Sequence, residues 1–458
     1  MRDAAGNLYG TTLAGGINDL GTVFKIDRSG KETILHSFQG TDGSEPFYGG
    51  LLIDSAGNLY GTTSSGGSYG NGTVFKLDTA GNETVLHSFQ GIDGEAPYGG
   101  LLRDPAGNLY GTTSAGGSYG AGTVFRLDIQ GHATVLHSFQ GSNDGATPYG
   151  TLTMDREGNL LGTTVLGGAS DNGTVFKLDI LGNTTVLHSF QGGADGSNPY
   201  AGVTVDDAGN LYGTTDGGGT YGFGTAFKVD TRGKETVLHS FQGNNDGANP
   251  DGALVIDGAG NLFGTTVFGG GSADDGTVFM LDHSGKEVVL HSFQGPDGYE
   301  PFAGLITDPA GDLYGATNGG GSHLGGTIFK IDVFAHFTSF EAKLDVKAGP
   351  PASYQLLANL TQASNAVPIN PLTQGMVLSI GPFYTLTLPG YVFSQNKKGS
   401  YVYENPLLEV RITETGVDAK TGAISWQVQV QASRAILLLP KNSSITLTLG
   451  YNTGTTTP

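Results

Sequence analysis

Residues 98–147 read YGGLLRDPAGNLYGTTSAGGSYGAGTVFRLDIQGHATVLHSFQGSNDGAT, and this unit determines the architecture. It contains four short runs typical of β-strands: GGLLRD, NLYGTT, GTVFRLD and ATVLHSFQ. The spacer D-x-x-G-N separates the first two runs, and D-x-x-G-x separates the last two. Because Asp closes Asx-type turns and Gly accepts a positive φ, each spacer predicts a tight hairpin. The unit therefore predicts a four-stranded antiparallel sheet.

The same phrases recur along the chain at spacings of 50 to 52 residues. GNLYGTT and its variants begin at Gly6, Gly57, Gly107, Gly158, Gly209, Gly260 and Gly311. GTVF and its variants also occur seven times, and LHSFQG occurs six times. This period predicts an all-β fold with a seven-bladed β-propeller, whose closed ring removes exposed sheet edges. A parallel β-helix is the alternative, but its coils normally need fewer residues and lack two hairpins per turn.

The GNLYGTT phrase fits a blade that packs both faces against its neighbours. Its first Gly belongs to the turn, and its Leu and Tyr serve the two faces. We expect the second Gly to lie where a neighbouring backbone comes close. The phrase is therefore interpreted as scaffold.

The motif set GNLYGTT, GTVFKLD, TVLHSFQG and PYGGL resembles the GloVer tandem repeat of bacterial choice-of-anchor proteins and, more distantly, the SBBP-type propeller repeat. The resemblance covers residues 1 to about 332. It implies an exported or cell-surface bacterial protein of unknown activity. The C-terminal LTLGYNTGTTTP matches no sorting motif, so the resemblance leaves the anchor open.

Both ends of the repeat region are irregular. Met1-Arg2-Asp3 matches only the tail of a first strand, so we expect a truncated start, with a signal peptide lost from this chain. VFAHFTSF, residues 333–340, would have to replace the outer strand of the seventh unit. We expect the propeller to span residues 1–338.

Residues 339–458 have fewer glycines and longer alternating runs, such as FEAKLDVKA (340–348), YQLLANLTQ (354–362) and ISWQVQVQ (424–431). About eight such strands predict an immunoglobulin-like β-sandwich. This part carries no cluster of His or carboxylates, so we expect a packing or adhesion module.

Charge and composition exclude several functions. The 458 residues have a formal net charge of −20, and about −22 falls on the first 340 residues. This surface repels phosphate backbones and anionic lipids, which argues against nucleic acid or bare membrane as a partner. Cysteine is absent, which excludes thiol chemistry, and no run of 18 apolar residues predicts a transmembrane segment. We expect an extracellular or cell-surface monomer.

Two residue types recur in every complete repeat. For the LHSFQG histidines we expect structural hydrogen bonding rather than metal or proton chemistry; they are His36, His87, His137, His188, His239 and His291. For the aspartates of the following loop we expect turn formation, with Ca²⁺ binding as the alternative; they are Asp42, Asp93, Asp144, Asp195, Asp246 and Asp297. No cofactor is predicted.

The repeats differ most in the loop between their second and third strands. Aromatic rings beside carboxylates suit sugars, through stacking and hydrogen bonds. The predicted ligand-binding residues of this rim are Tyr69, Tyr119, Asp171, Tyr221, Asp275 and His323. A second set follows the loop proline, where we expect it near the mouth of the ring: Tyr48, Tyr98, Tyr149, Tyr200, Asp251 and Phe302.

These residues predict a binding or adhesion protein that engages glycan or another surface polymer. A propeller-type polysaccharide lyase or hydrolase is the rival, and His323 with Asp274 and Asp275 is its nearest candidate. No catalytic residue is assigned, because the chain lacks G-x-S-x-G, H-E-x-x-H, P-loop and dinucleotide motifs. A structural envelope protein without a ligand is the third hypothesis.

Overall fold

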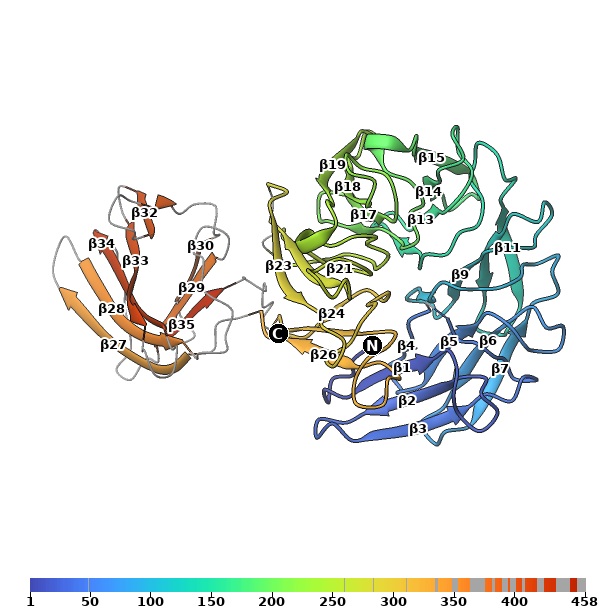
Figure 1. Ribbon diagram of the computed structural model, residues 1–458, viewed down its shortest axis with the longest axis horizontal. Coiled ribbons are helices and arrows are strands. Elements are labelled where there is room, and N and C mark those ends of the chain that lie inside the picture. Colours follow the sequence, from blue (N-terminus) through green and yellow to red (C-terminus); the bar gives the residue numbers. More distant parts are fainter. Residues whose placement is uncertain are drawn as a thin grey trace. The chain divides into compact units, whose positions relative to one another are not determined.

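The computed structural model describes residues 1–333, apart from positions 48, 259, 283 and 310, and the backbone of nine strands between 337 and 450. Residues 1–333 form seven antiparallel sheets that follow one another around a ring, from blue to orange in Figure 1. Within each sheet the strands are paired in chain order, as the two hairpin spacers predict. The fold is therefore an all-β, seven-bladed propeller.

The strands of the first four sheets have the following bounds. The first contains β1 (Leu8–Thr12), β2 (Thr22–Ile26) and β3 (Glu32–Ser37). The second contains β4 (Leu52–Ile53), β5 (Leu59–Thr63), β6 (Thr73–Leu77) and β7 (Glu83–Ser88). The third contains β8 (Leu102–Arg103), β9 (Leu109–Thr113), β10 (Thr123–Leu127) and β11 (Ala133–Ser138). The fourth contains β12 (Thr153–Met154), β13 (Leu160–Thr164), β14 (Thr174–Leu178) and β15 (Thr184–Ser189).

The remaining three sheets repeat this plan. The fifth contains β16 (Thr204–Val205), β17 (Leu211–Thr215), β18 (Thr225–Val229) and β19 (Glu235–Ser240). The sixth contains β20 (Val255–Ile256), β21 (Leu262–Thr266), β22 (Thr277–Leu281) and β23 (Glu287–Ser292). The seventh contains β24 (Ile306–Thr307), β25 (Leu313–Ala316) and β26 (Ile328–Ile331). Short 3₁₀ turns, η1 (Gly193–Asp195) and η2 (Asn244–Asp246), lie after β15 and β19.

The hairpin spacers fold as Asx turns. Asp104 accepts hydrogen bonds from the backbone N–H of Asn108 at 2.8 Å, from its side-chain amide at 2.7 Å and from the Tyr110 hydroxyl at 3.1 Å. Gly107 adopts φ +93°, which a residue with a side chain rarely does. The same contacts recur at Asp54 and Asp206, so the D-x-x-G-N spacer is confirmed as a turn.

The core lies between neighbouring sheets. Val74 and Phe89 of the second sheet pack in one buried cluster with Leu109 and Phe125 of the third. Each LHSFQG phenylalanine meets the GTVF phenylalanine of the next sheet edge to face, with ring centroids 5.0–5.2 Å apart. This arrangement explains why the two phrases are repeated together.

The second glycine of GNLYGTT has a different reason from the predicted one. A Cβ on Gly61 would lie 2.7 Å from Cζ of Phe75, its cross-strand partner. The group that comes close is therefore an aromatic ring of the same sheet and not a neighbouring backbone. The ring covers the glycine and fills the space that a side chain would occupy.

The ends of the propeller differ from the complete sheets. Met1 exchanges backbone hydrogen bonds of 2.8 and 2.9 Å with Tyr9, at the place of the inner strand. In the seventh sheet the described residues supply three strands. The segment expected as its outer strand lies partly outside the described residues, and residues from Phe337 onward belong to β27.

The C-terminal part contains two antiparallel sheets. One has the strand order β27-β28-β34-β33-β32-β31, and the other has the order β30-β29-β35. Their bounds are β27 (Phe337–Lys347), β28 (Ser353–Gln362), β29 (Gly375–Ile380), β30 (Tyr384–Leu388), β31 (Ser394–Gln395), β32 (Tyr401–Asn405), β33 (Leu408–Val417), β34 (Ile424–Ser433) and β35 (Ile445–Gly450). Each of the longer runs quoted from the sequence coincides with one of these strands.

Candidate functional site

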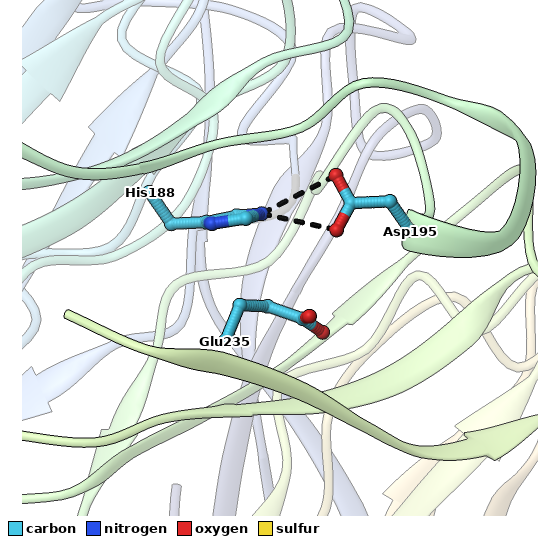
Figure 2. A group of neighbouring side chains, drawn as sticks. All are labelled: His188, Asp195 and Glu235. Atoms are coloured by element: carbon cyan, nitrogen blue, oxygen red, sulfur yellow. Dashed lines mark hydrogen bonds and ion pairs between the residues drawn. The ribbon is translucent and has the colours of Figure 1, made fainter.

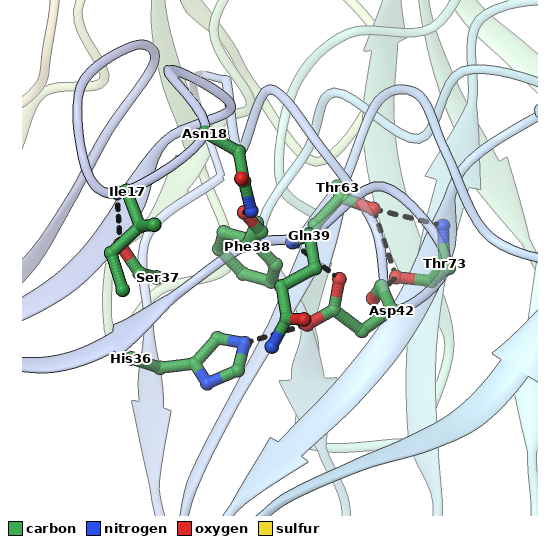
Figure 3. A network of polar contacts seen from close by, with 9 residues as sticks. All are labelled: Ile17, Asn18, His36, Ser37, Phe38, Gln39, Asp42, Thr63 and Thr73. Carbon is green, nitrogen blue, oxygen red and sulfur yellow. Dashed lines mark hydrogen bonds and ion pairs between the residues drawn. The ribbon is translucent and has the colours of Figure 1, made fainter.

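The repeated histidines and loop aspartates form one unit in each of six sheets. In the first sheet His36 Nε2 lies 2.9 Å from Asp42 Oδ2, and Asp42 Oδ1 accepts the backbone N–H of Gln39 at 2.8 Å (Figure 3). The other His–Asp pairs are 2.8–3.3 Å apart. The predicted structural hydrogen bonding of the histidines is confirmed. Each aspartate closes the loop that leads to the next sheet.

Three glutamates approach these pairs from the next sheet. Glu83, Glu235 and Glu287 each begin an outer strand, β7, β19 and β23. Figure 2 shows Glu235 beside the His188–Asp195 pair. Burial raises the pKa of Glu83 and of Glu235 to about 7, and a neighbouring aspartate adds to the shift. Burial and a hydrogen bond with Asp246 raise the pKa of Glu287 to about 9.

The predicted rim tyrosines lie at the same loop position in three sheets. Tyr69, Tyr119 and Tyr221 are 58%, 62% and 53% exposed. Their loops are tied to the outer strand of the same sheet, where the Ser88 hydroxyl accepts the N–H of Ser68 at 2.8 Å. Equivalent bonds of 3.1 and 2.7 Å hold the other two loops. The rings therefore stand in water on a fixed backbone.

The other predicted rim residues make local contacts. Asp171 has φ +57° and accepts the N–H of Gly167 at 2.8 Å, so it closes its own loop. Burial, followed by the charges of Asp297, Asp274 and Glu300, raises the pKa of Asp275.

His323 Nδ1 lies 2.9 Å from the Ser322 hydroxyl, and Asp274 accepts the N–H of Gly269 at 2.7 Å. His323 and Asp274, two members of the candidate catalytic set, therefore form hydrogen bonds within their own loops. The six predicted rim residues lie in successive sheets, one in each from the second to the seventh. The six residues therefore lie one to a sheet along the ring and do not form a single cluster.

The residues after the loop proline form a continuous row of rings. Phe47 and Tyr98 meet edge to face with centroids 5.5 Å apart, and Tyr98 stacks on Tyr149 at 4.6 Å. Tyr149 meets Tyr200 edge to face at 5.6 Å. Phe47 takes the position that the sequence analysis gave to Tyr48, which lies outside the described residues.

A carboxyl pair follows this row of rings. Asp251 occupies the next place in the series, and Asp216 follows β17 directly. Burial, and then the charge of and hydrogen bond with Asp216, raise the pKa of Asp251 to about 8. Asn249 donates its side-chain N–H to Asp216 Oδ1 at 3.0 Å. A carboxyl that keeps its proton near neutral pH beside a second carboxyl is suited to acid–base chemistry.

Sequence reasoning missed Asp216 and the three glutamates. A signal for Asp216 exists, because the residue after GTT is an aspartate in the fifth repeat alone; elsewhere it is Leu13, Ser64, Ser114, Val165, Val267 or Asn318. The glutamates share one position at the start of an outer strand. Comparing equivalent positions between repeats would have found both.

The fold and the repeat define the chain as a tandem-repeat β-propeller protein. Residues 1–205 and 155–390 match the model of the Gloeobacter/Verrucomicrobia repeat. The chain therefore belongs to this family, as the sequence resemblance indicated. No curated relative matches it.

Several solved structures are similar in fold. A gluconolactonase from Xanthomonas campestris has 17% identity and a TM-score of 0.35, over 53% of this chain and 74% of that one. A puromycin hydrolase has 11% identity and a TM-score of 0.45, over 79% and 58%. A PL25 ulvan lyase has 11% identity and a TM-score of 0.30, over 78% and 88%. At these identities the similarity concerns the fold alone.

Among the residues that the structure describes, no helix has the length and hydropathy needed to cross a bilayer.

Proposed function

We propose that the protein is an extracellular or cell-surface binding protein whose propeller rim engages glycan or another surface polymer. The observation that carries the proposal is the exposure of Tyr69, Tyr119 and Tyr221, each more than half in water at one loop position. Tyrosine offers a large, rigid, amphipathic contact at a low cost in conformational entropy. A flat ring of this kind suits the apolar face of a sugar.

The repetition of the rim favours a repeating ligand. Successive sheets present their loops in series, so that a polymer with repeating units would meet one loop after another. Linked weak contacts of this kind raise the overall affinity through effective concentration. The net charge of about −22 on the first 340 residues repels polyanions, so neutral polymers are favoured.

We further propose that residues 339–458 form an immunoglobulin-like sandwich from the two C-terminal sheets. Two antiparallel sheets with alternating sequences support this arrangement. In this proposal the sandwich is a packing or adhesion module and the propeller binds the ligand. The extracellular location rests on the resemblance to exported repeat proteins.

A glycan array tests the proposal. The purified chain is expected to bind a set of neutral glycans, and replacement of Tyr69, Tyr119 or Tyr221 by Ser should weaken that binding. Ile129→Ser and Leu181→Ser are the matched controls, since these side chains are 67% and 82% exposed at the opposite end of the strands. Equal loss in controls and tyrosine variants would contradict a specific role for the rim.

The Asp216–Asp251 pair supports a second function, a polysaccharide hydrolase or lyase. The pair joins Asp216 of the fifth repeat to Asp251 at the start of the sixth, and the raised pKa of Asp251 supplies a proton near neutral pH. Turnover of a neutral polysaccharide for a hydrolase, or of a uronate-containing one for a lyase, that disappears in Asp251→Asn but persists in Asp207→Asn would support it. Asp207 is the control because it is a fully exposed acid on the same sheet. If neither glycan binding nor polysaccharide turnover is found, the remaining hypothesis is a structural envelope protein without a ligand.

A further inference from the structure

Two clusters of metal-ligating side chains lie where neighbouring sheets meet. Each combines a His and an Asp from one sheet with a Glu from the next, and all three donor atoms lie within 4.8 Å of one another. We propose that each cluster binds one divalent transition-metal ion, with Zn²⁺ as the best match. The ligands are His188, Asp195 and Glu235 in one cluster and His239, Asp246 and Glu287 in the other.

The spacing of the donor atoms fits one ion. His188 Nε2 lies 3.2 Å from Asp195 Oδ1, and His239 Nε2 lies 3.3 Å from Asp246 Oδ1. With zinc–ligand bonds of about 2.0–2.2 Å, two ligands of a tetrahedral site are about 3.3–3.6 Å apart. The pairs thus need little movement to hold an ion between them.

Each glutamate brings an oxygen that is buried and unused. Oε1 of Glu235 and Oε1 of Glu287 are closed off from solvent and have no hydrogen-bond partner. Buried polar atoms are normally satisfied, so an orphaned carboxylate oxygen needs an explanation. A cation placed beside the His–Asp pair would supply the missing partner.

The donor set selects the metal. Imidazole nitrogen with two carboxylates suits Zn²⁺ and related transition ions, whereas Ca²⁺ and Mg²⁺ prefer oxygen ligands alone. Three protein ligands leave a fourth position for water. Calcium is the alternative ion for the loop aspartates, but the histidine nitrogen in each cluster argues against it.

The ligands would link three consecutive sheets. One ion joins the fourth sheet to the fifth, and the other joins the fifth to the sixth. A metal that binds the folded chain and not the unfolded one stabilises the fold by mass action. The expected role is therefore a clamp between blades.

The chain contains its own controls. In the third and fourth sheets the position of the glutamate is taken by Ala133 and Thr184, which begin β11 and β15. Glu32 has the same place in β3 but is exposed to solvent. Glu83 in β7 also has a buried Oε1 without a partner, but it forms no set of three donor atoms within 4.8 Å with His36 and Asp42. Among the described residues, only the two clusters named above bring three such donor atoms within 4.8 Å.

Isothermal titration of the chelator-treated full chain with ZnCl₂ tests the proposal. Binding should saturate at about two ions, as expected for the two clusters. Glu235→Ala and Glu287→Thr, which copy the residues of the third and fourth sheets, should each remove one ion. Zinc should also raise the melting temperature of the wild type, but not that of the double variant that carries both Glu235→Ala and Glu287→Thr. Glu32→Ala should bind as the wild type does.

A gain of a site provides the second test, which does not depend on the stability of the loss variants. Because Ala133 begins β11 as Glu235 begins β19, Ala133→Glu should place a carboxylate beside the His87–Asp93 pair and add a third ion. The proposal is overturned if the wild type binds no zinc saturably, if the double variant binds as much as the wild type, or if calcium binds in place of zinc.

Discussion

Replacement of Asp251 by Asn removes one carboxyl of the half-buried Asp216–Asp251 pair and should change how stability depends on pH. In the folded chain the pKa of Asp251 is raised from 3.8 to about 8, because of burial and the nearby Asp216. The folded state therefore holds a proton that the unfolded chain releases above pH 4. The stability that protonated Asp251 contributes is fully present below the pKa of the unfolded chain. It is lost as the pH rises through the pKa of Asp251 in the folded chain.

The size of the effect follows from the shift. A rise from 3.8 to about 8 corresponds to about 5–6 kcal/mol at 1.36 kcal/mol per unit. Asp251 is partly exposed, so solvent reduces this value, and we expect about 2–3 kcal/mol between pH 5 and pH 9. An asparagine carries no proton to lose, so the variant should gain stability relative to the wild type as the pH rises.

Urea denaturation at a series of pH values measures this difference. The free energy of unfolding of Asp251→Asn minus that of the wild type should increase from pH 5 to pH 9. Titrations of groups distant from Asp251 cancel in the subtraction. Asp207→Asn is the control, and its difference from the wild type should stay flat. Parallel profiles for Asp251→Asn and the wild type would refute the raised pKa of Asp251.

Three further predictions concern the scaffold and are measured by the same denaturation assay. Thr164→Val removes a buried 2.8 Å hydroxyl pair and should cost about 1–3 kcal/mol, whereas Thr184→Val, whose buried hydroxyl has no partner, should stay within about 0.5 kcal/mol. His239→Ala should cost about 1–2 kcal/mol, and His132→Ala, 77% exposed at its side chain, almost nothing. Phe139→Ala, fully buried between two sheets, should cost about 3–5 kcal/mol. A larger loss of stability in Thr184→Val than in Thr164→Val, or in His132→Ala than in His239→Ala, would contradict the hydrogen-bond assignments.

The propeller was predictable because one physical requirement is repeated seven times. Asp104 and Gly107 specify the turn by local chemistry, and the period near 50 residues allows little besides a ring of four-stranded sheets. The same reasoning was weaker for single residues. From the sequence, the second glycine of GNLYGTT was expected to lie against a neighbouring backbone. In the structure the ring of Phe75 lies against Gly61, and this contact depends on the pairing of two strands, which the phrase alone does not show.

The candidate site was only partly predictable. His188 and Asp195 were both singled out from the sequence, yet their pairing depends on the loop that returns Asp195 beside β15. Glu235 joins them from the next sheet, and Asp216 meets Asp251 through two separate loops. Contacts between sheets are set by the geometry of the ring, which a single repeat does not contain.

The length dependence of polymer binding tests the central proposal most directly. A series of neutral oligosaccharides of increasing length is titrated against the wild type and against Tyr69→Ser, Tyr119→Ser and Tyr221→Ser. We predict that wild-type affinity rises with chain length as further loops are engaged, and that each variant flattens this rise. An affinity that depends neither on length nor on the three tyrosines would contradict the account.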